Sequence, residues 1–478
     1  MSFLSPPVVV PNLSTSDVDL ELLGRTVAER VGTEIKSVDI AGKSELSRTF
    51  SVALRDGGTV IARILNANMP PVIIESEIAT LKYVRENTSI PVPTVFSYSL
   101  DPSHPLGCFL FVQKPPGIKL DTIFDDLAPS TQDTLVAQLT TYMVELSHHT
   151  FPSIGSLLLS SATATSPPLG PLTLPSFHTP SRSSLPSLSR GPFPTARAYF
   201  HACAQRELDS ARALFTQSAS DGYLRELEEG VLRVERAVGL ILELIGRCGG
   251  LNGDGDGEEG KEGDGVFTLD LHEVGLRSLW VDEENEIVCI TDWQSIVTRP
   301  LWRTAHLPPW LSPSLTSPSP STSTSTPDSL TRTQRLIAVV RRTIIDLEGP
   351  DSIYLRALDS DDTRHVLDEV TEYNAFTDGF LLVPTLESIL ATLPDASEPD
   401  KTGLISSVPN SNSGLSLTTR LNLQSPNFTG FGGLMSPPMS PVLASGGGGE
   451  RYERYGGFRR SLRGLVPAQE KEKAMGDV

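Results

Sequence analysis

Hydrophobic and polar positions divide the first 113 residues into a helix, a hairpin, a second helix and a second hairpin. Val18 to Val31 carries leucines and valines at helical spacing. Two β-rich runs flank Asp56-Gly57-Gly58, and this arrangement is typical of a hairpin. Apolar residues at helical spacing over 73–86 predict the second helix, which Pro91 and Pro93 end. The strands are expected at 48–54, 59–65, 94–100 and 107–112.

The pattern after residue 113 is mainly helical. Helices are expected at 130–146, 194–215, 221–247, 330–348 and 362–393. Ser130 and Asp133 resemble a capping box at the start of the first of them. Two short β-rich runs, 278–281 and 287–290, flank an acidic turn, and Asp292-Trp293 follows them directly. An acidic side chain at the end of a late hairpin is a candidate for chemistry.

Four stretches lack hydrophobic periodicity. They are rich in Ser, Thr, Pro, Gly or acidic residues, and they cover 160–190, 249–265, 311–332 and 396–478. Such segments cannot bury enough apolar surface to fold alone, so we interpret them as loops, disordered insertions and a disordered tail. Removing them leaves roughly 325 residues, which suits one two-lobed domain.

Composition narrows the function classes. The chain has 478 residues, a net charge of −19, 38 glycines and 38 prolines. An apolar run long enough to span a membrane is missing, and the first residues lack the basic and apolar regions of a secretory signal. The acidic balance disfavours nucleic-acid binding. Four scattered cysteines without CxxC spacing fit a reducing compartment, so a cytoplasmic location is expected.

Six segments between residues 48 and 302 together resemble the aminoglycoside phosphotransferase and choline-kinase-like superfamily, which is protein-kinase-like, and its fungal branch in particular. They are TVIARIL, SEIATLKYVRENTSIPVPTVFSYS, FLFVQKPPGIKL, FPSIGSLLL, RGPFPTARAYF and CITDWQSIVTRPLW. The resemblance implies an α+β, two-lobed fold. A small antiparallel-sheet N-terminal lobe would span 1–113, a mainly helical C-terminal lobe 114–395, and the tail 396–478.

The resemblance assigns roles to three charged residues. Arg63 stands where the family carries the base that contacts phosphate, and Arg can grip phosphate oxygens through two N–H groups. Glu77, on the next helix, would pair with Arg63 and fix its direction. Asp292 would bind Mg²⁺, which prefers carboxylate oxygen. The alternatives are a surface Arg, a solvated Glu and an Asp that caps a turn.

The catalytic loop departs from the family pattern of His-Gly-Asp, four spacers and Asn, in which Asp is the base and Asn a metal ligand. Two registers are open. Anchoring on the strand 278–281 puts Glu273 at the base position and Ser278 at the metal-ligand position. Anchoring on Asp270 makes that residue the base but leaves Gly275 where Asn belongs. We favour the strand anchor, and neither register restores the full pair.

Two further positions are candidates for nucleotide contact. The run Ala41-Gly42-Lys43-Ser44 could cover phosphate with backbone amides and the Ser44 hydroxyl, and a plain turn explains it equally well. Val112 lies in a run that resembles the connection between the lobes, whose backbone would meet adenine. By periodicity alone Val112 belongs to a buried strand.

Two hypotheses of different classes follow. In the first, the chain uses ATP and Mg²⁺ to phosphorylate a hydroxyl or amine of an unidentified small molecule. In the second, it is a pseudokinase, a nucleotide-binding or scaffolding module without turnover, because the catalytic-loop pair is not intact. Neither involves a membrane, and the tail is a candidate for contacts with protein partners.

Overall fold

The structure is a computed structural model. It describes residues 18–160, 167–183, 185–218, 224–251, 266–271, 274–311, 327–360 and 363–393. The predicted tail 396–478 and most of the insertions at 249–265 and 311–332 lie outside these ranges. Among the described helices, none is both long and apolar enough to cross a bilayer.

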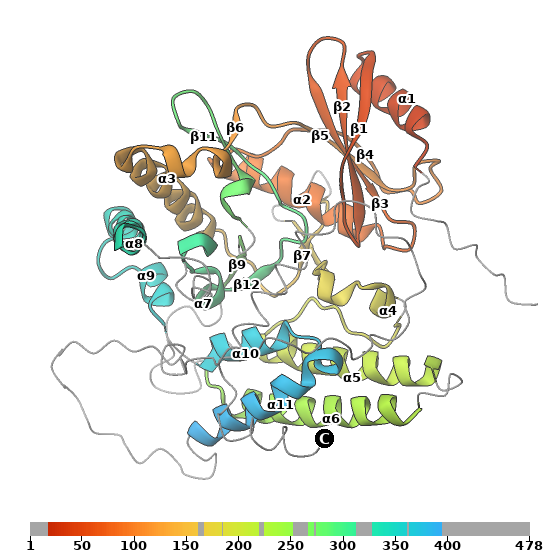
Figure 1. The fold of residues 1–478 in the computed structure, drawn as a ribbon, viewed down its shortest axis with the longest axis vertical. Coiled ribbons are helices and arrows are strands. Elements are labelled where there is room, and N and C mark those ends of the chain that lie inside the picture. Colours follow the sequence, from red (N-terminus) through yellow and green to blue (C-terminus); the bar gives the residue numbers. More distant parts are fainter. Residues whose placement is uncertain are drawn as a thin grey trace, which may run out of the picture.

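The N-terminal part is an antiparallel sheet flanked by two helices (Figure 1). Its elements are α1 (Leu20–Val31), β1 (Ile35–Lys43), β2 (Ser47–Leu54), β3 (Thr59–Leu65), α2 (Val72–Asn87), β4 (Val95–Ser99) and β5 (Phe109–Gln113). The five strands follow the order β1-β2-β3-β5-β4. Asp19 caps α1 by accepting hydrogen bonds from two first-turn amides, and Gly32 ends the helix with a φ of 79°.

Period-two alternation places one face of the sheet against α1. Val60, Ala62 and Ile64 of β3 are buried there with Leu23 and Val27 of α1. The intervening residues of β3 are half-buried and lie on the other face, which is the α2 side. A single strand therefore presents apolar side chains to α1 and a charged side chain to α2.

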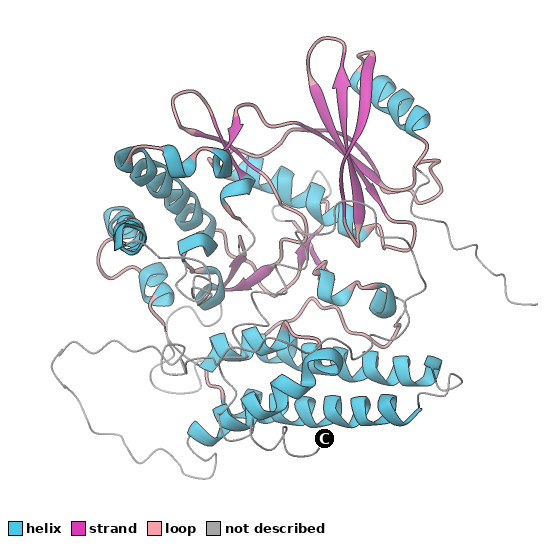
Figure 2. Ribbon diagram, in the orientation of Figure 1, coloured by secondary structure: helices cyan, strands magenta, loops and turns pink. Residues whose placement is uncertain are grey.

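The rest of the chain is mainly helical, with short strands between the helices (Figure 2). Its longer elements are α3 (Pro129–Ser147), α5 (Ala196–Ser218), α6 (Leu224–Arg247), α8 (Pro327–Glu348), α10 (Thr363–Thr371) and α11 (Ala375–Thr392). Its shorter helices are α4 (Pro180–Ser183), α7 (Leu301–Thr304) and α9 (Ile353–Leu358). Its strands are β6 (Ile118–Lys119), β7 (Ser156–Leu157), β8 (Leu169–Gly170), β9 (Phe267–Leu269), β10 (Leu279–Val281), β11 (Ile287–Ile290) and β12 (Thr298–Pro300). The predicted α+β class, with a small antiparallel sheet and a mainly helical remainder, is confirmed, while the boundaries 1–113 and 114–395 stay predictions.

One continuous hydrophobic core joins α2 to the helical part, so the two parts share packing as well as a chain connection. Tyr83 of α2 adds a polar contact, because its hydroxyl lies 3.0 Å from Nδ1 of His149 at the end of α3. The chain connection itself runs from β5 through Gly117 to β6. Gly117 has a φ of 82°, and a Cβ there would lie 2.1 Å from the Val281 carbonyl oxygen, so only glycine fits.

The interpretation of 160–190 as a segment without a core is wrong for its described residues. Leu172, Leu174, Phe177 and Leu188 are buried in the main core. Arg182, which is also buried, donates to both carboxylate oxygens of Glu207 on α5 at 2.8 and 3.0 Å. Side-chain contacts hold this irregular segment in place. Because it has few helical or strand residues, its buried positions show no hydrophobic periodicity in the sequence.

One strand was missed, and two local expectations also need correction. Residues 35–43 form β1, an edge strand whose mostly exposed residues give no alternation to recognise. The Ser130 capping box does not form, because α3 begins at Pro129 without a side-chain cap. The predicted helix at 362–393 is two helices, and Asn374 caps the second through its side-chain oxygen.

Candidate active site

Arg63 and Glu77 form an ion pair between β3 and α2. Arg63 projects from the face of β3 opposite its buried residues, and its Nη1 donates to Oε1 of Glu77. The side chains are 19% and 6% exposed. The predicted pairing is confirmed, and the alternative of a solvated Glu is wrong. Oε2 of Glu77 is buried without a hydrogen-bond partner among the described residues, so this carboxylate keeps one uncommitted oxygen.

Asp292 and Ser278 meet at the base of the β10–β11 hairpin. The Ser278 hydroxyl donates to Oδ2 of Asp292 at 2.6 Å. The Thr291 amide donates to the Ser278 carbonyl oxygen at 2.8 Å, and this hydrogen bond fixes the distance between the two ends of the hairpin. The register anchored on the strand 278–281 predicts that Ser278 and Asp292 lie close together. Asp292 is exposed, while Ser278 is fully buried.

The turn at Asp292 is held in an unusual conformation. Asp292 has a φ of 68°, in the left-handed region that Asp and Asn tolerate better than other residues with side chains. Trp293, 2% exposed, anchors the turn by donating from Nε1 to the Ile290 carbonyl oxygen at 2.7 Å. Such backbone conformations cluster at functional sites because the surroundings must enforce them. The exposed carboxylate is therefore held by its own turn and by Ser278.

Asp270 lies in a different environment. It is fully buried, with Oδ2 3.4 Å from Nε of Arg299 and Oδ1 3.6 Å from Nε2 of His306. Arg299 in turn contacts Asp368 at 3.0 Å and Glu372 at 3.3 Å. A carboxylate enclosed in this way has no open path to a substrate hydroxyl. The geometry thus differs from what the second register expects of a catalytic base.

The remaining predicted residues are placed as follows. Glu273 lies outside the described residues. Oγ of Ser44 accepts from the amides of Leu46 and Ser47 at 3.2 and 2.9 Å, as in a plain hairpin turn. Those two amides are thus committed to Ser44. Val112 pairs with β3 on one side and β4 on the other, so it lies in the interior of the sheet.

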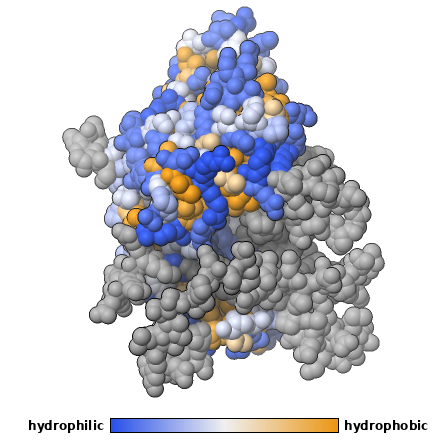
Figure 3. Space-filling view, turned by 90° about the vertical axis from the view of Figure 1, so that its left-hand side faces the viewer, coloured by the Kyte–Doolittle hydropathy of each residue, from blue (hydrophilic) through white to orange (hydrophobic). Residues whose placement is uncertain are grey.

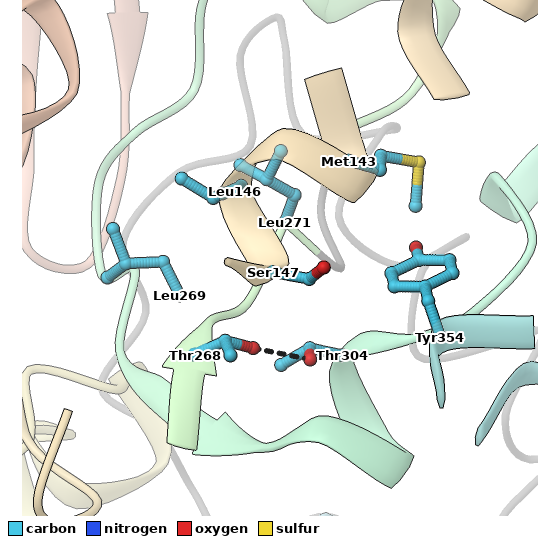
Figure 4. Close-up of a pocket in the computed structure, with 8 residues that line it drawn as sticks. All are labelled: Met143, Leu146, Ser147, Thr268, Leu269, Leu271, Thr304 and Tyr354. Atoms are coloured by element: carbon cyan, nitrogen blue, oxygen red, sulfur yellow. Dashed lines mark hydrogen bonds between the residues drawn. The ribbon is translucent and has the colours of Figure 1, made fainter. Parts of the chain in front are cut away.

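A small pocket lies beside the Asp270 segment (Figure 4). Its volume is about 10 Å³, room for about one water molecule and too little for a nucleotide. The hydroxyl of Tyr354 points toward Met143 across it, and Thr268 and Thr304 share a hydrogen bond of 2.7 Å at its floor. Burial raises the pKa of Tyr354, which keeps the phenol neutral. Its small volume and its lining make this pocket part of the packed interior and not a nucleotide site.

Sequence reasoning missed Arg299 and His306. Both lie within or just beyond the segment CITDWQSIVTRPLW, and nothing in their spacing to Asp270 marks an ion pair. Among the described residues, no group of three or more His, Cys, Asp or Glu side chains is arranged to hold a metal ion. A metal at Asp292 would therefore take much of its coordination from phosphate and water.

Comparison with known proteins gives matches of limited extent. No family model matches the chain. A subtelomeric hrmA-associated cluster protein of Aspergillus fumigatus is 28% identical over 124 residues, which cover 25% of this chain and 24% of that protein. The counterpart in a second strain matches equally. The chain thus spans about a quarter of the length of the curated relatives it matches.

Several solved structures that match this chain in a structural comparison are phosphotransferases. A thermostable mutant of aminoglycoside phosphotransferase APH(4)-Ia, in complex with AMP-PNP and hygromycin B, is 15% identical with a TM-score of 0.39, covering 77% of this chain and 95% of that one. The streptomycin–ATP complex of APH(2")-IIa is 10% identical with a TM-score of 0.39, covering 79% and 97%. Macrolide 2'-phosphotransferase MphH of Brachybacterium faecium is 13% identical with a TM-score of 0.36, covering 78% and 93%. We therefore argue function from the side chains of this chain.

Proposed function

We propose that this chain binds a magnesium–nucleotide complex and transfers the terminal phosphoryl group to a hydroxyl or amine of a small molecule. The observation that carries the proposal is the Arg63–Glu77 ion pair, together with an exposed carboxylate on the β10–β11 hairpin. A strand cation held by a helix Glu, and a metal-binding Asp after a late hairpin, are the two fixed charges that kinase-like phosphoryl transfer requires. ATP is the nucleotide that the sequence resemblance implies.

The donor set at Asp292 suits a magnesium ion. The carboxylate is exposed, and among the described residues only Ser278 bonds to it, through Oδ2. Oδ1 is thus available as a hard oxygen ligand. Bound Mg²⁺ would neutralise charge on the phosphates. Ser278 offers one neutral oxygen in place of an amide carbonyl, and its hydroxyl already orients Asp292.

Arg63 would bind phosphate oxygens. Nη1 is committed to Glu77, which leaves the other guanidinium donors of a partly exposed side chain. Because Glu77 is buried, the pair restricts where the guanidinium can point. Holding the cation in advance lowers the entropy lost when phosphate binds.

The acceptor would be oriented by Glu273 rather than by Asp270. Asp270 is enclosed by Arg299 and His306, whereas the strand register that sets Ser278 beside Asp292 assigns the base position to Glu273. Glu273 would take the proton of the acceptor hydroxyl. The acceptor oxygen would attack the terminal phosphorus at the same time, and the nucleoside diphosphate would leave.

The first experiment measures nucleotide binding and turnover together. Mg-ATP should raise the Tm of the wild-type chain, and Asp292→Asn should remove most of that shift. Glu283→Gln, on the exposed turn of the same hairpin, is the matched control and should keep it. Phosphate release or transfer is then followed over a broad panel of hydroxyl and amine acceptors. A wild-type Tm that Mg-ATP leaves unchanged would overturn nucleotide binding.

A second candidate is a pseudokinase that binds nucleotide without turnover. The sealed position of Asp270 and the serine at position 278 favour it. Nucleotide stabilisation with no turnover on any acceptor would support this candidate. Turnover gained by Ser278→Asn, or by Glu273→Asp, would instead identify the residue that limits a phosphotransferase.

Location and partners extend the same proposal. None of the four cysteines forms a disulfide and all four are buried, which fits a reducing, cytoplasmic environment. Protein partners of the tail 396–478 stay a prediction, because the tail lies outside the described residues.

A further inference from the structure

Helix α3 contacts both of the segments that lead to the two halves of the candidate site. One segment is the chain directly after α2, the helix that carries Glu77. The other is β11, whose last residue, Ile290, lies just before Asp292. The Ile290 amide donates to the Pro91 carbonyl oxygen at 2.8 Å, so the two segments are also joined to each other.

Glu145 of α3 holds the first segment through a single residue. Its Oε1 accepts from the Ser89 amide at 2.7 Å, and its Oε2 accepts from the Ser89 hydroxyl. Ser89 directly follows Thr88, the C-cap of α2. Two hydrogen bonds from one residue to one carboxylate fix its orientation as well as its distance, and a charged acceptor strengthens both bonds. Glu145 therefore determines where the end of α2 lies relative to α3.

Gln138 holds the second segment from the same face of α3. Its Oε1 accepts from the amide of Ile287, the first residue of β11, at 2.9 Å. Its Nε2 donates to the Tyr142 hydroxyl at 3.1 Å, which fixes the orientation of the side-chain amide. Residues seven positions apart share one face of a helix and lie about 10 Å apart along its axis. With Gln138 at one contact and Glu145 at the other, α3 is a rigid spacer between β11 and the end of α2.

From these contacts we infer that Glu145 is a positioning residue that acts through Ser89. It keeps the Arg63–Glu77 pair at the distance from Asp292 that a metal–nucleotide complex requires. The inference rests on the proposed function, because only a ligand that contacts Arg63 and, through its metal ion, Asp292 is sensitive to this distance. A ligand held at one end gains the second contact at little further loss of entropy only while the distance fits.

Calorimetry with two ligands separates positioning from a general loss of structure. Glu145→Ala should lower the affinity for Mg-ATP about tenfold. The affinity for ATP in EDTA, which can reach Arg63 but brings no metal ion to Asp292, should change by less than about twofold. Equal losses for the two ligands, or no loss for either, would overturn the positioning role and leave the proposed function standing. A wild-type chain that does not bind Mg-ATP would overturn both.

Milder variants test the same route if Glu145→Ala does not fold. Ser89→Ala removes the hydroxyl bond and keeps the amide bond, so the affinity for Mg-ATP should fall about threefold. Ser89→Thr keeps a hydroxyl and should bind Mg-ATP like the wild type. If Ser89→Thr binds as weakly as Ser89→Ala, with circular dichroism showing folded protein, the route through the Ser89 hydroxyl is overturned.

Thr141→Ala is the matched control on α3. Thr141 lies between Gln138 and Glu145, and its hydroxyl donates to the Ala137 carbonyl oxygen of the same helix at 2.9 Å. This variant should leave the affinities for Mg-ATP and for ATP in EDTA unchanged. A loss of Mg-ATP affinity equal to that of Glu145→Ala would contradict a specific role of the Glu145 carboxylate.

Discussion

Two arrangements of Arg and carboxylate, one in the candidate site at Arg63 and one around Asp270, differ in how far they are enclosed. Among the described residues, Arg63 has one acidic partner, Glu77, and a side chain that is 19% exposed. The Arg299 side chain is 3% exposed and lies among three carboxylates, those of Asp270, Asp368 and Glu372. In the first arrangement, guanidinium N–H groups of Arg63 stay available for a ligand. In the second, the guanidinium of Arg299 contacts side chains of the protein itself. Enclosure, rather than residue type, is what separates Arg63, for which we propose phosphate binding, from the buried Arg299.

Electrostatics around Arg299 agree with a structural role. Burial by itself lowers the pKa of Arg299, but Tyr199 and the surrounding carboxylates raise it well above its usual range. Tyr199 also contributes its hydroxyl, which accepts from Nη1 of Arg299 at 3.1 Å. Because the guanidinium stays charged and its neighbours stay paired, the cluster joins Asp270 of the predicted catalytic loop to α10.

The largest expected effect comes from removing the enclosed cation. Arg299→Met removes the arginine that contacts buried Asp270 and one of the two arginines that contact Asp368, and the unfolding free energy should fall by about 3–5 kcal/mol. Urea denaturation at neutral pH measures it. A loss below about 1 kcal/mol would remove the contrast between the two arrangements.

Arg63 should affect nucleotide binding more than folding. Arg63→Met would remove the charge-assisted hydrogen bonds that we propose to phosphate, and Mg-nucleotide affinity should fall about tenfold to a hundredfold by calorimetry. The variant also leaves Glu77 buried and unpaired, so some stability is lost. Arg63→Met combined with Glu77→Met should recover that stability without recovering affinity. Recovery of both would contradict a phosphate-binding Arg63.

The Ser278 hydroxyl should have a smaller effect. Ser278→Ala removes one charge-assisted hydrogen bond of 2.6 Å from Asp292, and the unfolding free energy should fall by about 1 kcal/mol. Ser103→Ala is the control, because Ser103 donates to Asp101 at 2.7 Å in an exposed loop. Equal losses in thermal melts of the two variants would show that the burial of Ser278 adds nothing.

The smallest effect belongs to a surface pair. Arg341 on α8 contacts both carboxylate oxygens of Asp359 with exposed side chains. Arg341→Ala should change the unfolding free energy by about 0.5 kcal/mol or less, because exposed ion pairs are screened by water and salt. A loss comparable to that of Arg299→Met would show that enclosure does not set the scale.

The elements with hydrophobic periodicity could be predicted from the sequence. Which charged side chains are enclosed by other residues could not. The runs at 48–54 and 59–65 became β2 and β3 because alternation there reports a sheet with one buried face. The Arg63–Glu77 pair could be predicted because both residues lie in segments with strong family resemblance. Figure 3 shows a face of the molecule on which hydrophilic and hydrophobic surface are interspersed.

The sequence could not separate Asp270 from Asp292. Each is a lone Asp beside a short apolar strand, yet Asp270 is fully buried and Asp292 is exposed. What separates them is Arg299, nearly thirty residues after Asp270 and brought back by the pairing of β12 with β9. Long-range strand pairing of this kind leaves no local signal. The same holds for the core residues of 160–190, whose contacts lie on distant helices.

Gly117 has a mechanical consequence. Its close approach to the Val281 carbonyl and the pairing of β6 with β10 attach the chain after it to the hairpin that carries Asp292. Along this covalent connection, rotation of the sheet against the helices must then be absorbed between Gln113 and Gly117. Two of the three intervening residues are prolines with a fixed φ. The connection therefore has few backbone dihedral angles that can rotate, and this restricts how far the sheet can turn against the helices.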